Sequence, residues 1–163
     1  MASFIVEKSF AKSFGFRPSV SYVQKGQALP KPNSLVDKYY LALRYVEFNP
    51  DILYYVGGNE GGFFIGASPS IAFNLPSKRV SETDGVKTTN SIEFGREGTA
   101  FMRGTDWGAN FTAGFRSKSG FLFNLSYNRG FRNLAIEGDP GELRNSYFGV
   151  QIGVFLNNGK DSK

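Results

Sequence analysis

Five charged side chains have the types and spacing that could support chemistry: Arg17, Glu47, Asp51, Asp106 and Arg116. Two neighbouring carboxylates can act as general acid and general base, but the 163 residues include no histidine and no cysteine. Their absence removes the usual general base and every thiol nucleophile. Ion pairs between the carboxylates and the guanidinium groups explain these charges more simply than a reaction does. The sequence therefore predicts that the protein is not an enzyme and has no catalytic residue.

Two other motifs have some of the features of binding sites. The run GGNEGG at 57–62 is glycine-rich like a phosphate-binding loop, but no Lys-Ser or Lys-Thr pair follows it and a strand comes next. Glu137, Asp139 and Glu142 offer carboxylate oxygens to a divalent cation, but their spacing matches no calcium-binding loop. Acidic clusters of this kind are commonly just solvated. We therefore expect no cofactor and no metal site.

The charge distribution predicts no nucleic-acid partner. The formal net charge is +5, but the basic residues are scattered from Lys8 to Lys163 with acidic residues between them. They therefore form no basic stripe.

Strict two-residue alternation predicts the elements that position these side chains. Between Asp106 and Arg116, tryptophan, phenylalanine and alanine alternate with glycine, asparagine and threonine. Prolines interrupt three alternating segments, and Pro18, Pro50 and Pro69 are expected at bulges or register irregularities. The predicted strands are 14–24, 45–56, 63–75, 106–116, 121–128 and 148–156, with residues 4–8 as the end of a further strand.

The composition of the polar face favours a membrane barrel over a soluble one. That face is chiefly glycine, serine, asparagine and threonine, whereas a soluble barrel exposes mainly lysine and glutamate. We predict an all-β, antiparallel, up-and-down transmembrane β-barrel that forms one domain over residues 1–163. Its lumen is expected to hold a structural polar network. The predicted members are Arg17, Glu47, Asp51, Asp106, Asn110, Arg116 and Gln151.

The connections between predicted strands alternate in length. Residues 8–13, 57–62 and 117–120 are short connections, whereas 25–39, 76–105 and 130–145 are long. Outer-membrane barrels have this organisation, with tight periplasmic turns and longer external loops. Aromatic residues near the strand ends are predicted to form girdles at the two membrane interfaces. They are Tyr22, Tyr54, Tyr55, Trp107, Tyr127 and Tyr147.

Several segments resemble one protein family. FGFRPSVSYVQKG (14–26), RYVEFNP (44–50), FFIGASPSIAFNL (63–75), DWGANFTAGF (106–115) and YFGVQIGVFL (147–156) are similar to the PorT-like outer-membrane β-barrel proteins of Gram-negative bacteria. The similarity covers most of the chain through patterned rather than invariant motifs. It implies an eight-stranded barrel in the bacterial outer membrane, without enzymatic activity. Relative to that pattern, we expect the chain to lack the signal peptide and first strand, leaving six clear strands and a partial seventh.

The leading functional hypothesis is a barrel with a plugged lumen that has a structural or interaction role. Its partners would be outer-membrane lipid and a protein at the external loops, where Phe131, Arg132 and Arg144 are candidate contacts. A small porin-like pore is one alternative, although eight strands enclose an interior barely wide enough for side chains. A soluble calycin-like barrel is another. Its apolar ligand would lie among Phe63, Ile65, Phe111, Phe115, Phe123 and Ile152.

Overall fold

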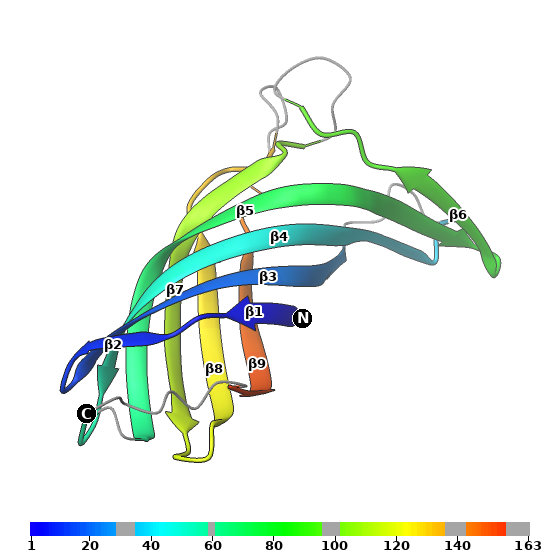
Figure 1. Cartoon of the computed structure of the whole chain (residues 1–163). Coiled ribbons are helices and arrows are strands. Elements are labelled where there is room, and N and C mark those ends of the chain that lie inside the picture. Colours follow the sequence, from blue (N-terminus) through cyan, green and yellow to red (C-terminus); the bar gives the residue numbers. More distant parts are fainter. Residues whose placement is uncertain (29–34, 59–60, 96–101, 136–142, 156–163) are drawn as a thin grey trace.

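The computed structural model describes residues 1–28, 35–58, 61–95, 102–135 and 143–155. Within these ranges, no helix is long and apolar enough to cross a membrane. The strands are β1 (Ala2–Ile5), β2 (Lys8–Ala11), β3 (Phe14–Ala28), β4 (Lys38–Tyr55), β5 (Gly62–Thr83), β6 (Val86–Ser91), β7 (Thr105–Arg116), β8 (Phe121–Gly130) and β9 (Ser146–Val154) (Figure 1).

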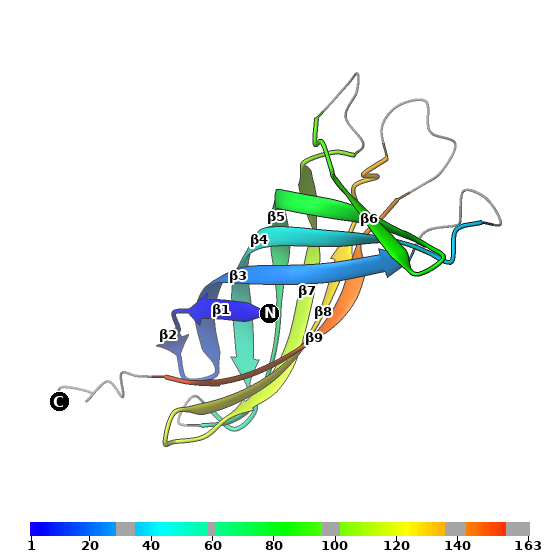
Figure 2. The ribbon, with the colours of Figure 1, turned by 90° about the vertical axis from the view of Figure 1, so that its right-hand side faces the viewer.

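All nine strands belong to one antiparallel sheet that curls into an open barrel (Figure 1, Figure 2). The strand order is β1-β3-β4-β5-β7-β8-β9. Strand β2 pairs with β3 beyond the end of β1, and β6 pairs with residues 78–83 of β5. This confirms the prediction of an all-β, antiparallel, up-and-down architecture. Among the described residues, no ladder pairing joins β1 to β9, so the sheet is open between these two edge strands. We call this opening the seam.

Alternation places apolar side chains on the convex face of the sheet and polar ones on the concave face. On β7, Trp107 and Phe111 are 55% and 53% exposed, whereas Asp106 and Asn110 are each 4% exposed. A water-soluble barrel has the opposite arrangement, because burial of the apolar face is what stabilises it. The convex face is therefore suited to lipid.

This arrangement overturns the soluble-binder alternative. The side chains that would have surrounded an apolar ligand point away from the concave face and are between 36% and 72% exposed. They are Phe63, Ile65, Phe111, Phe115, Phe123 and Ile152.

The three strand prolines form a row across β3, β4 and β5 without shifting the register. Pro18 pairs with Pro50, and the flanking pairs Phe48↔Ile71 and Ile52↔Ala67 place Pro50 opposite Pro69. Ladder pairing between β4 and β5 is interrupted between those flanking pairs, because proline has no N–H to donate. The expectation of bulges at the prolines is therefore wrong. The register of β4 and β5 shifts elsewhere, between Ala42 and Arg44.

The outer ends of β3, β4 and β5 are longer than predicted. β5 extends to Thr83, and a tight turn with positive φ at Asp84 (50°) and Gly85 (76°) leads into β6. Much of the predicted long connection 76–105 is therefore a β-hairpin. The shift between Ala42 and Arg44 lets the ladder continue past Pro76. We call this end of the barrel the loop rim and the opposite end, with the short connections, the turn rim.

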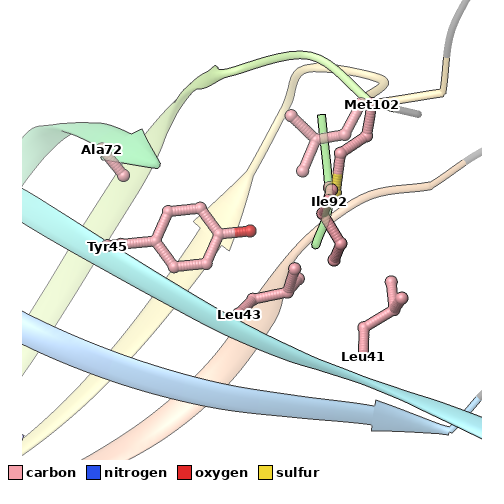
Figure 3. Packing of buried hydrophobic residues seen from close by; sticks show 7 residues of the cluster. Leu41, Leu43, Tyr45, Ala72, Ile92 and Met102 are labelled. Carbon is pink, nitrogen blue, oxygen red and sulfur yellow. The ribbon is translucent and has the colours of Figure 1, made fainter. Parts of the chain in front are cut away.

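Apolar side chains cluster at both ends of the concave face. The apolar cap at the loop rim consists of Leu41, Leu43, Tyr45, Ala72, Ile92, Met102 and Leu134. Figure 3 shows Leu41 and Leu43 of β4 lying beside Ile92 and Met102, which come from the connection between β5 and β7. A smaller cluster near the turn rim consists of Leu53, Tyr55, Phe64 and Leu122. The side chains of Arg17, Glu47 and Asp51 lie on the concave face between these two apolar layers.

Candidate functional site

An ion pair between Arg17 of β3 and Asp51 of β4 lies on the concave face. The two residues are register partners, and Arg17 Nη2 lies 3.5 Å from Asp51 Oδ2. The same nitrogen donates to Thr112 Oγ1 at 3.2 Å and Asn124 Oδ1 at 3.3 Å. The guanidinium carbon of Arg17 lies 4.6 Å from the ring centroid of Phe64. One guanidinium group therefore contacts residues of β4, β5, β7 and β8.

The other oxygen of Asp51 completes this cluster. Asp51 Oδ1 accepts hydrogen bonds from Ser68 Oγ at 2.7 Å and from Asn110 Nδ2 at 3.0 Å. Both carboxylate oxygens thus have a polar partner, as a buried charge requires. The chemistry of the cluster is that of a structural ion pair, in which Arg17 Nη1 is buried without a hydrogen-bond partner.

Glu47 of β4 is the hub of a second cluster nearer the loop rim. Its Oε1 accepts from Tyr147 Oη at 2.6 Å, Asn49 Nδ2 at 3.0 Å and Asn128 Nδ2 at 3.2 Å. Lys25 Nζ lies 3.7 Å from Glu47 Oε2 and 4.1 Å from the ring centroid of Tyr147. Because Tyr147 is on β9, these contacts cross the lumen between strands far apart in the sheet.

Asp106 of β7 lies beneath the apolar cap. Asn145 Nδ2 donates to Asp106 Oδ2 at 2.9 Å and to Tyr45 Oη at 3.1 Å. This amide therefore connects β7 to β4 at the start of β9.

The polar contacts nearest the turn rim involve Glu7, which lies between β1 and β2. Its Oε1 accepts from Tyr55 Oη at 2.7 Å and from Arg116 Nη1. The Arg116 guanidinium carbon also lies 5.4 Å from the Tyr55 ring centroid. Arg116 thereby connects the end of β7 to the first residues of the chain.

The structure brings the predicted lumen residues together in more than one cluster. Arg17, Asp51 and Asn110 share one cluster, and Gln151 Oε1 accepts from Asn124 Nδ2 at 2.7 Å at its edge. Glu47 and Asp106 belong to the clusters nearer the loop rim. Arg116 forms its ion pair with Glu7, which was not among the predicted acidic residues.

Sequence reasoning missed several members of these clusters, although the alternation contained the signal for two of them. Tyr55 and Tyr147 have the opposite parity to the convex residues Tyr54 and Phe148, so both lie on the concave face. Their assignment to the aromatic girdles was wrong. Lys25 was missed because the strand predicted over 14–24 was expected to end one residue before it, whereas β3 continues to Ala28.

The predicted loop contacts lie at the loop rim. Phe131 is 44% exposed and packs edge-on against Trp107, with ring centroids 5.7 Å apart. Arg132 Nη1 donates to Thr105 Oγ1 and, at 3.2 Å, to the Thr105 carbonyl oxygen. Arg144 is exposed and lies just before Asn145. The acidic trio considered for a cation, Glu137, Asp139 and Glu142, lies outside the described residues.

Little open space remains around Asp51, whereas a larger cleft of about 600 Å³ borders Lys25, Asn145 and Tyr147. A cavity bordered by Asp51, Asn110 and Asn124 has a volume of about 10 Å³, and a single water needs about 10–15 Å³ on the same measure. No group of three or more carboxylates in the described part of the chain is placed to hold a metal ion. The arrangement is suited to joining the strands across the lumen.

Comparison with known proteins identifies one family. Residues 1–135 match the family model described as outer membrane protein beta-barrel domain. No curated protein and no solved structure matches the chain significantly.

Proposed function

Because the chain belongs to the outer membrane protein β-barrel domain family, we propose that it is a non-enzymatic barrel, closed to solutes, that acts through its loop rim. Family membership implies the bacterial outer membrane, and in this proposal the apolar convex face meets lipid there. The segments quoted above favour the PorT-like group of Gram-negative bacteria. The loop rim faces the cell exterior in this proposal, as the longer connections of such barrels do.

The contacts that cross the lumen carry the proposal that the lumen is closed to solutes. Tyr147 of β9 bonds to Glu47 of β4, and Asn124 of β8 bonds to Arg17 of β3. Opening a solute path would break these bonds and leave buried charges without partners, which is costly in a lumen of low dielectric. The apolar cap adds a second barrier at the loop rim.

The loop rim offers rigid residues for a protein partner. The ring of Phe131 is held against Trp107, and the Arg132 guanidinium is held by Thr105. Aromatic and arginine side chains that are fixed before binding lose little entropy on association. We propose that Phe131 and Arg132 contribute to such an interface, with Arg144 beside them.

Planar-bilayer recording tests the closed lumen. The reconstituted full chain should show no stepwise conductance, whereas a large general porin in the same bilayer should conduct. Stable conductance steps from the chain would refute the proposal. A double variant, Tyr147→Ala with Glu47→Ala, removes the cross-lumen contacts of Glu47 with Tyr147 of β9 and Asn128 of β8, and is expected to increase leak if those contacts close the lumen.

Photo-crosslinking in cells tests the role of the loop rim. A photoreactive phenylalanine analogue at Phe131 should yield one discrete adduct with a protein. The same analogue at Phe63, on the convex face near the turn rim, is the control and should yield lipid adducts or none. Equal protein adducts at the two positions would refute a specific interface at the loop rim.

A further inference from the structure

A bulge in β5 turns one basic side chain to the convex face. Arg44 of β4 pairs with Leu75 of β5, and Ala42 pairs with Lys78. Two residues of β5 therefore lie opposite one residue of β4, and the extra residue reverses the alternation of β5. Beyond it Ser77 is 2% exposed, whereas Lys78 is exposed. Even-numbered residues of β5 before the bulge lie on the concave face, so Lys78 would point there if the bulge were absent.

Arg44 and Lys78 are neighbours at the loop-rim edge of the convex face, and we call them the cationic pair. Arg44 alternates with Tyr45 of the apolar cap, so its side chain points to the convex side. The two residues occupy diagonal positions of the β4–β5 ladder, which are about 7–8 Å apart, so both side chains can reach one ligand. Neither forms an ion pair with another described residue, including the exposed Glu93 on the connection after β6. Strands β4 and β5 each have a paired strand on both sides, so the cationic pair lies away from the seam.

The apolar convex surface begins directly beside the cationic pair. The next pairs of the ladder toward the turn rim include Val46↔Phe73 and Phe48↔Ile71. Phe73, Ile71 and Phe48 are 52%, 45% and 40% exposed. Two residues of a strand span about 7 Å, so the same two strands present cations and, next to them, an apolar surface. An amphiphile with an anionic headgroup matches both parts.

Small residues leave the surface beside the cationic pair open. Gly26 of β3 pairs with Ala42 in the row that also contains Lys78. A Cβ atom added at Gly26 would have no neighbour closer than 4.0 Å. A headgroup can therefore approach the two cations over these small residues.

We propose that the cationic pair binds the phosphate monoester headgroup of a membrane lipid whose acyl chains lie on Phe73, Ile71 and Phe48. A phosphate monoester carries about 1.5 to 2 negative charges at neutral pH, which two cations match. The Arg44 guanidinium can donate two parallel hydrogen bonds to phosphate oxygens, and the Lys78 ammonium adds a point charge. A phosphodiester headgroup with one charge would leave one cation unpaired. The inference rests on the contact of the convex face with lipid in the proposed function, but on neither the closed lumen nor the protein partner.

Quenching of a single tryptophan by lipids with brominated acyl chains tests the proposal on the full chain in phosphatidylcholine vesicles. Trp107→Phe with Phe73→Trp places the only tryptophan beside the cationic pair. Trp107→Phe with Ile65→Trp is the matched control, because Ile65 is on the convex face of the same strand, about 26 Å nearer the turn rim. Brominated phosphatidylcholine should quench both variants, which tests lipid contact alone. Brominated phosphatidic acid, added as a minor component, tests the headgroup.

We expect the Phe73→Trp variant to prefer phosphatidic acid over phosphatidylcholine about tenfold, since each basic residue at a bilayer surface favours anionic lipid by a factor of about five before salt screening. The Ile65→Trp variant should show no preference. Arg44→Gln with Lys78→Gln should remove the preference of the Phe73→Trp variant. Lys38→Gln with Lys87→Gln gives the same change of charge about 13 Å farther from the apolar surface and should keep it. If the glutamine variants do not fold, about 1 M NaCl should remove the preference without any further substitution.

Four results would contradict these expectations in different ways. Equal preference in the Phe73→Trp and Ile65→Trp variants, or a preference that survives loss of both cations, would overturn the proposal. Equal preference for brominated phosphatidylglycerol, whose headgroup carries one charge, would overturn the assignment of a phosphate monoester. Inorganic phosphate that removes the preference would assign the cationic pair to free phosphate instead of lipid. Absence of quenching by brominated phosphatidylcholine in the Phe73→Trp variant would refute the lipid contact of the proposed function itself.

Discussion

Replacing Arg17 by leucine removes the only cation in contact with Asp51 among the described residues. Asp51 is 4% exposed and keeps the donors Ser68 and Asn110, so the variant has a buried carboxylate with two hydrogen bonds and no counter-charge. Removing one partner of a buried ion pair typically costs about 3–5 kcal/mol of unfolding free energy. We expect Arg17→Leu to lose an amount in this range.

A double-mutant cycle separates the free energy of the Arg17–Asp51 ion pair from the loss of packing around Arg17. Asp51→Asn keeps an acceptor for Ser68 and Asn110 but leaves the Arg17 charge unpaired, so it should also destabilise the barrel. The double variant buries neither charge and should be more stable than the sum of the single changes predicts, by about 1–3 kcal/mol. Lys87→Leu, at an exposed position of β6 in the hairpin at the loop rim, is the control and should stay within about 0.5 kcal/mol of the parent.

Urea unfolding in phospholipid vesicles provides the measurement. Trp107 is the single tryptophan and lies on the convex face, so its emission reports departure from lipid without interference from another indole. If Arg17→Leu costs under about 1 kcal/mol and the coupling is under about 0.5 kcal/mol, the ion pair does not stabilise the barrel and the reasoning from its burial is refuted.

Three further changes test other parts of the structure in the same assay. Tyr147→Phe removes the hydroxyl that donates to Glu47 and should cost about 1.5–3 kcal/mol; an unchanged midpoint would mean that this bond does not form in lipid. Gly66→Ala should destabilise by about 1–3 kcal/mol because an added methyl group would lie 2.5 Å from its nearest neighbour, whereas Gly153→Ala, with 4.0 Å, should be nearly neutral. Phe111→Arg puts a charge on the convex face and should cost about 2–4 kcal/mol if that position lies near the bilayer midplane; full stability would refute the lipid-facing assignment.

The sequence could predict which face of the sheet each side chain of the site occupies, because alternate residues of a strand point to opposite faces. Asp106 and Asn110 lie on the concave face because Trp107 and Phe111 occupy the other parity, and this follows from strand geometry alone. The same rule would have placed Tyr55 correctly. Tyr55 was nevertheless assigned to a girdle, because aromatic residues near strand ends were expected to lie at the membrane interfaces.

Contacts across the lumen could not be predicted in this way. Arg116 meets Glu7, which is 109 residues away, because the tilt and stagger of the strands bring the end of β7 to the first residues of the chain. Strand tilt and stagger are collective properties of the closed or nearly closed sheet, and they are not encoded in any single segment. The length of β5 was missed for a related reason, since the shift between Ala42 and Arg44 changes which residues of β4 are opposite it.

The proline row has a consequence for how the barrel opens. Pro18, Pro50 and Pro69 carry no amide hydrogen, and the β4–β5 ladder is interrupted between the pairs Phe48↔Ile71 and Ile52↔Ala67. Fewer hydrogen bonds therefore join β4 to β5 at the proline row than on either side of it. Local opening can then stop at the row, so that the outer half exchanges its amide hydrogens with deuterium while the inner half stays protected. The part of the barrel between the proline row and the loop rim could then rearrange around a partner. The part between the row and the turn rim would keep its hydrogen bonds.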